Sequence, residues 1–228
     1  MKKVITLFVF VATAFIAQSQ PRTASPNSNW PYLLEDFSPC VILHEDGNVT
    51  KVKANYNLLN EVLQYNKNGS IMNFTDPGDI AKISFNEFVM EFVDNDYYIR
   101  ISADDSKIHV YEKNKGNMND LMESKGAYGS STTTAATSQS IDLDIGGINS
   151  FDVRMLWDAK DRGKIFRVNN QFYFLIKNTE ELIPLKKNNL LKSFPNHEKE
   201  IKSYLKQERI NLSNTDDVRK ITVFLNTL

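Results

Sequence analysis

The chain has 228 residues, and its 27 Lys and Arg against 28 Asp and Glu give a formal net charge of −1. Such a balance provides no positively charged surface for nucleic acid or an anionic membrane, so nucleic-acid binding is not expected. The composition, 41% hydrophobic, is that of an ordinary globular protein, and the length suits one large β domain or two small ones.

The first twenty residues, MKKVITLFVFVATAFIAQSQ, have the pattern of a secretory signal peptide. Lys2 and Lys3 form a short basic region, an apolar segment follows up to Ala17, and Ala17-Gln18-Ser19 resembles a cleavage site. The apolar segment is shorter than the roughly 20 residues that span a bilayer. We therefore expect residues 1–19 to be removed, and the mature chain to be periplasmic or secreted and not to span a membrane.

Cys40 is the only cysteine, which excludes an internal disulfide framework in an exported protein. It begins the apolar run Cys40-Val41-Ile42-Leu43, so a buried, unreactive thiol is expected. A reactive thiol is the alternative.

Residues 20–30 are polar and rich in Pro, Ser and Asn, which predicts a disordered arm. A single β-rich domain is predicted over residues 31–228. The turn sequence Asp46-Gly47-Asn48 predicts a hairpin between Cys40–His44 and Val49–Ala54.

Residues 56–65 are ambiguous between helix and strand. Leu58, Leu59, Val62 and Leu63 fit one face of a helix, but the segment is short, lacks a helix cap and has strand-like flanks. We favour strand, turn, strand.

Short runs of β-branched and aromatic residues, separated by turn residues, predict further strands. These are Ile71–Phe74, Ile80–Phe85, Glu87–Phe92, Tyr97–Ser102 and Lys107–Lys113, and later Phe151–Trp157, Lys164–Val168, Gln171–Lys177 and Leu182–Lys186. Their alternation predicts one apolar face and one mixed face, as in an antiparallel sheet with one wet side. Turns are predicted at Lys160-Asp161-Arg162-Gly163 and at Asn169-Asn170.

Residues 114–150 carry a Ser/Thr/Ala-rich run and few aromatics, which predicts a flexible insertion. Residues 195–228 predict a pair of helices: Pro195 or Asn196 opens the first, and Thr215 caps the second. The predicted fold class is therefore α+β, with a mainly antiparallel sheet (meander, sandwich or open barrel) and a C-terminal pair of α-helices.

No residue pattern indicates catalysis, a cofactor or a metal. The catalytic and nucleotide-binding motifs G-x-S-x-G, H-E-x-x-H, Walker and Rossmann do not occur. His44, His109 and His197 share no spacing, and Asp142-Leu143-Asp144-Ile145-Gly146-Gly147 lacks the third acid and the distal Glu of an EF-hand calcium loop. We assign no catalytic, cofactor-binding or metal residue from the sequence.

Aromatic residues form two groups within predicted strands. Tyr97 and Tyr98 lie in one strand, and Phe172, Tyr173 and Phe174 in another. They fit cross-strand packing in the core, with a sugar or peptide groove as the alternative.

Four stretches of the chain carry a family resemblance: Tyr56-Asn57-Leu58, Leu63-Gln64-Tyr65, Asp79–Phe85 and Phe194–Leu228, which has Asn226 near its end. Through them the chain resembles uncharacterised small exported β-rich proteins of the Bacteroidota, over most of residues 40–113 and 164–228. The insertion at 114–150 departs from that pattern. The resemblance implies an exported bacterial protein and no particular activity.

These observations favour an exported, non-catalytic envelope or secreted module that binds a protein, glycan or lipid partner. The alternatives are a hydrolase of envelope polymers with scattered carboxylates and a lipid carrier with an apolar cleft. Converging carboxylates in a pocket would favour the enzyme, a dry apolar cleft the carrier, and a flat face with aromatics the binding module.

Overall fold

The computed structural model describes residues 22–24, 30–74, 77–121, 158–177, 179 and 181–228. The strands are β1 (Arg22–Ala24), β2 (Ser38–His44), β3 (Val49–Asn57), β4 (Val62–Lys67), β5 (Ser70–Asn73), β6 (Ile80–Ser84), β7 (Val89–Val93), β8 (Asp96–Arg100), β9 (Ile108–Gly116), β10 (Phe166–Ile176) and β11 (Ile183–Pro184). The helices are η1 (Pro77–Asp79), η2 (Met118–Asp120), α2 (Lys187–Ser193), η3 (Pro195–His197), α3 (Glu198–Gln207) and α4 (Thr215–Leu225).

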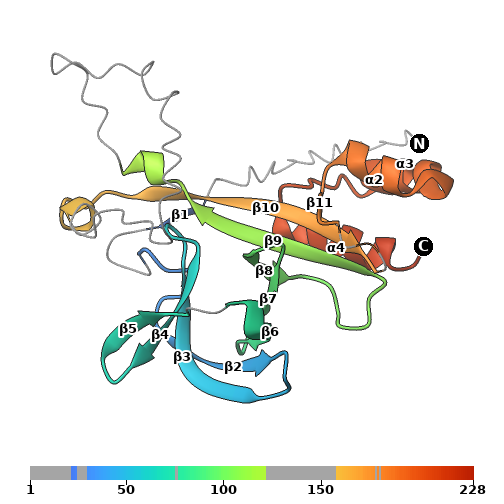
Figure 1. Cartoon of the computed structure of the whole chain (residues 1–228). Helices are drawn as coiled ribbons and strands as arrows, with labels where there is room; N and C mark the ends of the chain where they lie inside the picture. Colours follow the sequence, from blue (N-terminus) through green and yellow to red (C-terminus); the bar gives the residue numbers. More distant parts are fainter. Residues whose placement is uncertain (1–21, 25–29, 75–76, 122–157, 178, 180) are drawn as a thin grey trace, which may run out of the picture.

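All strands belong to one antiparallel sheet in the order β1-β10-β9-β8-β7-β6-β2-β3-β4-β5, with β11 also paired to β10. The long β9–β10 pair runs through the whole molecule, with the curled β2–β7 part beneath it and the C-terminal helices gathered at one end (Figure 1). The predicted α+β class with a mainly antiparallel sheet is confirmed. Within the described residues, no helix has both the length and the apolar character needed to cross a membrane.

The first strands follow the turn chemistry of the sequence. β2 and β3 pair across Asp46-Gly47-Asn48, where Gly47 has a φ of 84° and Asp46 accepts a hydrogen bond from the Asn48 backbone N–H at 2.9 Å. The ambiguous segment 56–65 is strand, turn, strand, as favoured. The side chain of Asn57 accepts the backbone N–H groups of Leu59 and Asn60, at 3.0 and 3.1 Å, and so holds the turn that a helix would replace.

The predicted turn at Asn169-Asn170 is wrong, because β10 continues straight through both residues. They pair with Lys115 and Asn114 of β9, and the Asn170 amide donates to Glu112 at 2.8 Å. A long partner strand supplies the backbone hydrogen bonds that a local turn would have provided, so pairing overrides the turn propensity of Asn.

The predicted insertion begins later than residue 114. Asn114 and Gly116 belong to β9, and the Gly116 N–H donates to the Leu58 carbonyl at 2.7 Å. Residues 122–157, which include the predicted strand Phe151–Trp157 and the calcium-like loop at 142–147, lie outside the described residues.

The predicted turn at Lys160–Gly163 is shorter than expected. Residues 158–161 are helical, and Arg162 and Gly163 form the turn, with a Gly163 φ of 68°.

Part of the predicted disordered arm is ordered. Residues 22–24 form β1, which pairs with Phe166–Val168 at the edge of β10. Trp30 is buried edge-on against Phe166, with ring centroids 6.0 Å apart. An open strand edge and a large apolar ring therefore order positions that polar composition alone marks as disordered.

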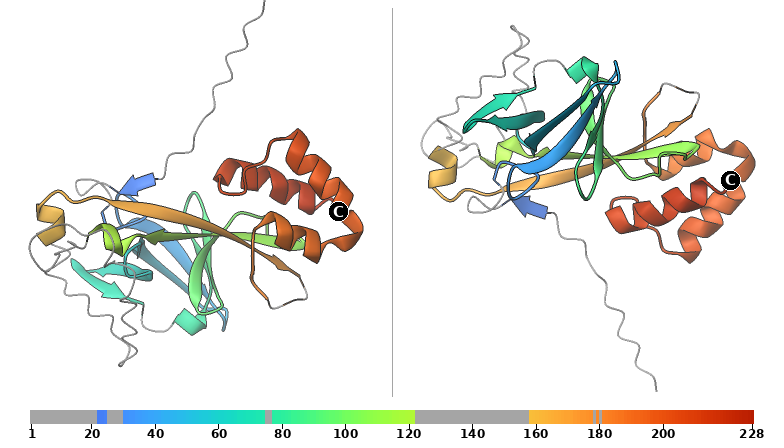
Figure 2. Two further views of the ribbon diagram at one scale, coloured as in Figure 1. Left: turned by 90° about the horizontal axis from the view of Figure 1, so that it is seen from above. Right: turned by 90° about the horizontal axis from the view of Figure 1, so that it is seen from below.

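The apolar residues form two cores. The first fills the curl of the sheet and includes Trp30, Ile42, Tyr56, Leu63, Ile83, Met90 and Phe166. The second lies between the other half of β9–β10 and the helices and includes Val110, Phe174, Leu190, Ile201, Val218, Ile221 and Leu225. Figure 2 shows the curled strands and the C-terminal helices toward different ends of the β9–β10 pair.

The C-terminal helices differ from the predicted pair in two respects. An additional helix, α2, precedes them and buries Leu190. The cap of α4 is Asn214 rather than Thr215, since the Asn214 side chain accepts the N–H groups of Asp216 and Asp217. Phe224 is only partly buried and stacks on Tyr204, with ring centroids 4.1 Å apart.

Candidate functional site

A single row of residues crosses seven strands on one face of the sheet. Each member is directly paired with the next, so all of them point to the same side. The row consists of Lys51, Val41, Ser84, Val89, Arg100, Tyr111 and Tyr173. Together with same-face neighbours two positions along each strand, it forms what we call the mixed face, opposite the first core.

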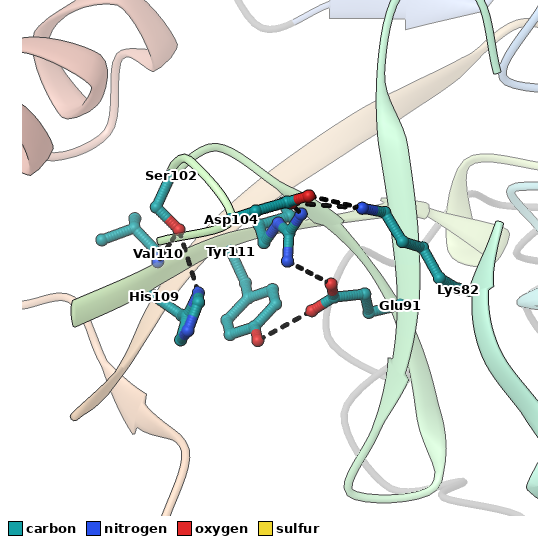
Figure 3. Close-up of polar contacts among 8 residues, drawn as sticks. Lys82, Glu91, Ser102, Asp104, His109, Val110 and Tyr111 are labelled. Carbon is teal, nitrogen blue, oxygen red and sulfur yellow. Dashed lines mark hydrogen bonds and ion pairs between the residues drawn. The ribbon is translucent and has the colours of Figure 1, made fainter. Parts of the chain in front are cut away.

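The centre of the mixed face is a chain of ion pairs and hydrogen bonds (Figure 3). The Tyr111 hydroxyl donates to Glu91 at 3.0 Å, and Arg100 donates to the other Glu91 oxygen at 2.5 Å. Asp104 pairs with Arg100 and, at 2.9 Å, with Lys82. Because each charge faces an opposite charge, this chain fixes β6, β7, β8 and β9 relative to one another.

The pKa shifts in this region favour the neutral forms of Tyr111 and His109. Burial, together with the Glu91 carboxylate, raises the pKa of Tyr111, and burial lowers the pKa of His109. His109 lies 3.4 Å from the Ser102 hydroxyl, a long contact, and that hydroxyl already accepts the Val110 N–H. At 3.4 Å the Ser102–His109 hydrogen bond is longer than the roughly 2.6–3.2 Å expected between a nucleophile and its base.

A second charged cluster surrounds Lys113. Its ammonium pairs with Glu61 at 2.8 Å and with Asp96, while Glu61 also pairs with Lys115. Burial alone would lower the pKa of Lys113, but the two carboxylates raise it. Burial alone would likewise raise the pKa of Glu61, but hydrogen bonds from the two lysines hold it below its usual range.

The predicted aromatic groups divide between the two faces of the sheet. Tyr97, Phe172 and Phe174 are core residues. Tyr98 lies on the mixed face, 5.5 Å from Tyr173 in a T-shaped contact, and burial raises its pKa to about 12. The interpretation as core residues is therefore confirmed for those three, whereas Tyr98 and Tyr173 pack across strands on the opposite face, where Tyr173 is partly accessible.

The β2–β3 end of the mixed face is apolar and open. Val41 and Leu43 are each 38% exposed and Val49 is 56% exposed, and the three meet through the pairings of β2 with β3. Lys51 and Lys53 are exposed beside them on β3. Neighbouring exposed aliphatic side chains with a basic rim are typical of an interaction surface.

The clefts in the described part of the molecule include three shallow ones. One of about 310 Å³ lies between the β3–β4 turn and the end of β9, and includes Glu61, Lys115 and Asn169. A second, of about 300 Å³, borders β10, β11 and the α3–α4 loop. The third, of about 400 Å³, brings together three carboxylates, and its lining residues are Leu34, Glu35, Asp36, Ser38, Phe85, Asn86, Glu87 and Phe88.

The structure keeps the candidate histidines apart. His44 contacts Thr50 at 2.9 Å, His197 contacts Glu200 at 3.3 Å, and His109 lies on the mixed face. Over the described ranges, no group of three or more His, Cys, Asp or Glu is placed to hold a metal ion.

Cys40 is buried as expected for an unreactive thiol. Burial raises its pKa to about 11, so the nucleophilic thiolate is scarce at neutral pH.

The ion-pair chain was missed by sequence reasoning. Alternation within β8 places Tyr98 and Arg100 on one face, which the sequence could have indicated, but their partner Glu91 follows only from the register of β7 with β8. No protein-family model, no curated protein and no solved structure matches this chain.

Proposed function

We propose that this protein is an exported, non-catalytic binding module of the periplasm or the exterior, which holds a protein partner on the β2–β3 end of its mixed face. The observation that carries the proposal is the exposed group Val41, Leu43 and Val49 beside Lys51 and Lys53. The signal-peptide pattern and the resemblance to exported proteins of the Bacteroidota support the location.

The chemistry of this surface favours a protein over a small ligand. Its aliphatic side chains gain most by burial against other apolar side chains, at about 25 cal/mol per Å². Its lysines complement carboxylates at the rim, where charges steer association and select partners. The Arg100–Glu91 pair and its neighbours keep the supporting strands in a fixed arrangement, which lowers the ordering cost of binding.

The test compares binding to envelope fractions before and after charge is placed on the surface. Leu43→Asp combined with Val49→Asp should abolish binding to an envelope protein fraction. Ile71→Asp, at a 50% exposed position of the edge strand β5, is the matched control and should bind as the unmodified chain does. Binding that survives protease treatment of the fraction, or that transfers to purified cell-wall glycan or to lipid vesicles, would contradict a protein partner.

A hydrolase of envelope polymers is a second candidate, because Glu35, Asp36 and Glu87 line one cleft. Phe88, which is partly buried, stacks there on the buried Phe85 with ring centroids 4.8 Å apart, and its ring is one that a sugar can contact. Glycosidases use paired carboxylates as acid and as base or nucleophile. The unmodified chain, Glu35→Gln and Glu87→Gln are each incubated with cell-wall glycan. If only the unmodified chain releases soluble fragments, a hydrolase becomes the favoured function in place of a binding module.

The lipid-carrier alternative receives less support. The three clefts described above each have charged or amide side chains in their lining, whereas a carrier needs a dry apolar one.

A further inference from the structure

The β4–β5 hairpin carries the only Asn-Gly pair in the sequence, Asn68-Gly69. Lys67 pairs with Ser70, so Asn68 and Gly69 are the two residues of the turn. Their φ angles are 54° and 88°, as a type I′ turn requires. All four residues are exposed, and β5 stands at the end of the strand order (Figure 1), so water has free access to this turn.

An exposed Asn-Gly pair has an internal nucleophile and an internal electrophile. Attack of the Gly69 backbone nitrogen on the Asn68 side-chain carbon Cγ closes a five-membered ring. The Asn68 side chain has no hydrogen-bond partner among the described residues. The space around Gly69 is open as well, since a Cβ built there would meet nothing within 4 Å. Neither the amide nor the ring is therefore obstructed by the rest of the described structure.

One contact restrains this reaction. The Gly69 N–H donates to the side-chain oxygen of Asn66 at 2.9 Å. The nitrogen attacks only after hydroxide has removed its proton, and a hydrogen-bonded N–H is shielded from hydroxide, as it is in hydrogen exchange. Asn66 is itself exposed, so water competes for the bond and the bond opens locally.

We propose that Asn68 is a site of spontaneous deamidation and that the side chain of Asn66 sets the rate. Hydroxide takes the proton of the Gly69 N–H, and the nitrogen forms a bond to the Asn68 Cγ. The bond from Cγ to the side-chain nitrogen breaks, and that nitrogen takes a proton from water and leaves as ammonia, which returns the hydroxide. Water then opens the ring at one of its two carbonyls and leaves aspartate or isoaspartate at position 68.

Both products change the edge of the sheet. Aspartate adds a negative charge to the turn. Isoaspartate also places the side-chain carbon in the main chain, so a two-residue turn no longer holds Lys67 opposite Ser70. Among the described strands β5 pairs with β4 alone, so this modification loosens the outermost strand.

The turn between β2 and β3 is exposed too but is built differently. The Asp46 carboxylate accepts the backbone and side-chain N–H groups of Asn48, at 2.9 and 2.5 Å, and an ionised carboxylate is a poor electrophile. Asn48 precedes Val49, whose branched side chain crowds the attacking nitrogen. Asn48 is therefore the internal control for Asn68.

The test follows position 68 by peptide mapping and mass spectrometry while the folded chain is kept at mildly alkaline pH. Asn66→Ala removes the acceptor and should speed the conversion about fivefold, which corresponds to roughly 1 kcal/mol for one hydrogen bond. Asn66→Asp keeps an acceptor at the same place and is the matched control. It should react no faster than the unmodified chain, and Asn48 should stay unchanged in all three.

Two further measurements connect the rate with the hydrogen bond. Hydrogen exchange at the Gly69 N–H should quicken in Asn66→Ala by the same factor as the conversion, because both reactions begin with loss of the same proton. In urea, where the contact is absent, the unmodified chain and Asn66→Ala should convert at equal rates.

Three results would overturn the inference. The first is an equal rate in the folded unmodified chain and in folded Asn66→Ala, including no conversion in either while the unfolded chain converts. The second is a conversion of Asn66→Asp as fast as that of Asn66→Ala. The third is the same acceleration by Asn66→Ala in urea, which would make it an effect of the local sequence and not of the folded turn.

Discussion

Arg100 is a largely buried charge that depends on its two acidic partners. Its side chain is 9% exposed and that of Glu91 is 15% exposed, whereas Asp104, the other partner of Arg100, is 69% exposed. Without Glu91, the guanidinium would be buried beside a single carboxylate that water already screens. The cost of removing one partner therefore exceeds the value of an average surface ion pair.

We expect Glu91→Gln to lower the free energy of unfolding by about 1–3 kcal/mol, the range for a buried group left without its partner. Urea unfolding measures it. The control is Glu198→Gln, whose pair with Lys202 joins two half-exposed side chains on α3 and should change stability by less than about 0.5 kcal/mol. Equal effects of the two substitutions would mean that the chain on the mixed face is ordinary surface charge.

Glu61 makes the stability pH-dependent on the acid side. Its pKa is lowered in the folded state by Lys113 and Lys115, so its contribution is present above the unfolded value of about 4.3 and is lost as pH falls through the folded pKa. Glu61→Gln should therefore cost stability at pH 7 and much less in acid. Urea unfolding at a series of pH values measures the difference, which should shrink below about pH 4.

The contribution of Lys113 to stability depends on pH in the opposite direction from that of Glu61. Its raised pKa means that its stabilising contribution is present below about 10.4 and is lost as pH rises through the folded value. The difference between Glu61→Gln and the unmodified chain should thus stay constant between pH 6 and 9. A difference that varied across this window would indicate a titrating group other than this cluster.

At the scale of elements, the sequence predicts strands well where turn residues and alternation agree. β2, β3 and β6 follow from the Gly, Asn and Asp turns that bound short runs of apolar and β-branched residues. The predictions fail at Asn169-Asn170 and at α2, because pairing with β9 and packing of Leu190 decide those elements. Local propensity cannot report a partner that lies far away in the sequence.

Gly116 shows how the end of β9 is specified. A Cβ at this position would lie 2.7 Å from Leu59 Cδ2 and 2.8 Å from Phe166 Cε2, inside the first core. Gly116→Ala should lower stability by about 1–3 kcal/mol through overpacking. Gly78→Ala is the control, because a Cβ there meets nothing within 4 Å. Thermal unfolding of both variants measures the difference. Equal melting temperatures would mean that the residues around this end of β9 move apart at little cost to make room for the added Cβ.

At the scale of the whole molecule, β10 contributes residues to both cores and so joins them. The alternation in the sequence predicts a mixed face, but the row from Lys51 to Tyr173 depends on the register of every strand between them. The sequence therefore predicts that such a face exists, but it does not predict which residues form it. The clefts were not predictable, since each combines elements distant in the sequence.

Both sides of the predicted insertion are fixed to the first core. Leu121 and Ala159 are buried there, and Lys164 donates to the Leu121 carbonyl at 3.1 Å. Asp120 pairs with Arg167 of β10 at 2.6 Å. The chain thus returns to its starting point before β10 begins, and the intervening segment can be shortened without separating β9 from β10.

Replacing residues 123–156 by a Gly/Ser linker of about 12 residues, which spans roughly 20 Å, should shift the melting temperature by less than about 2–4 °C. The physical reason is that loop closure changes by only about 0.6 kcal/mol for each doubling of loop length. The control is a longer replacement, of residues 117–156, which also removes Leu121 and the Asp120–Arg167 pair and should melt well below the first variant. If the shorter replacement is as damaging as the longer one, the segment contributes to the fold itself, and Tyr128 becomes the first residue to test as part of a site.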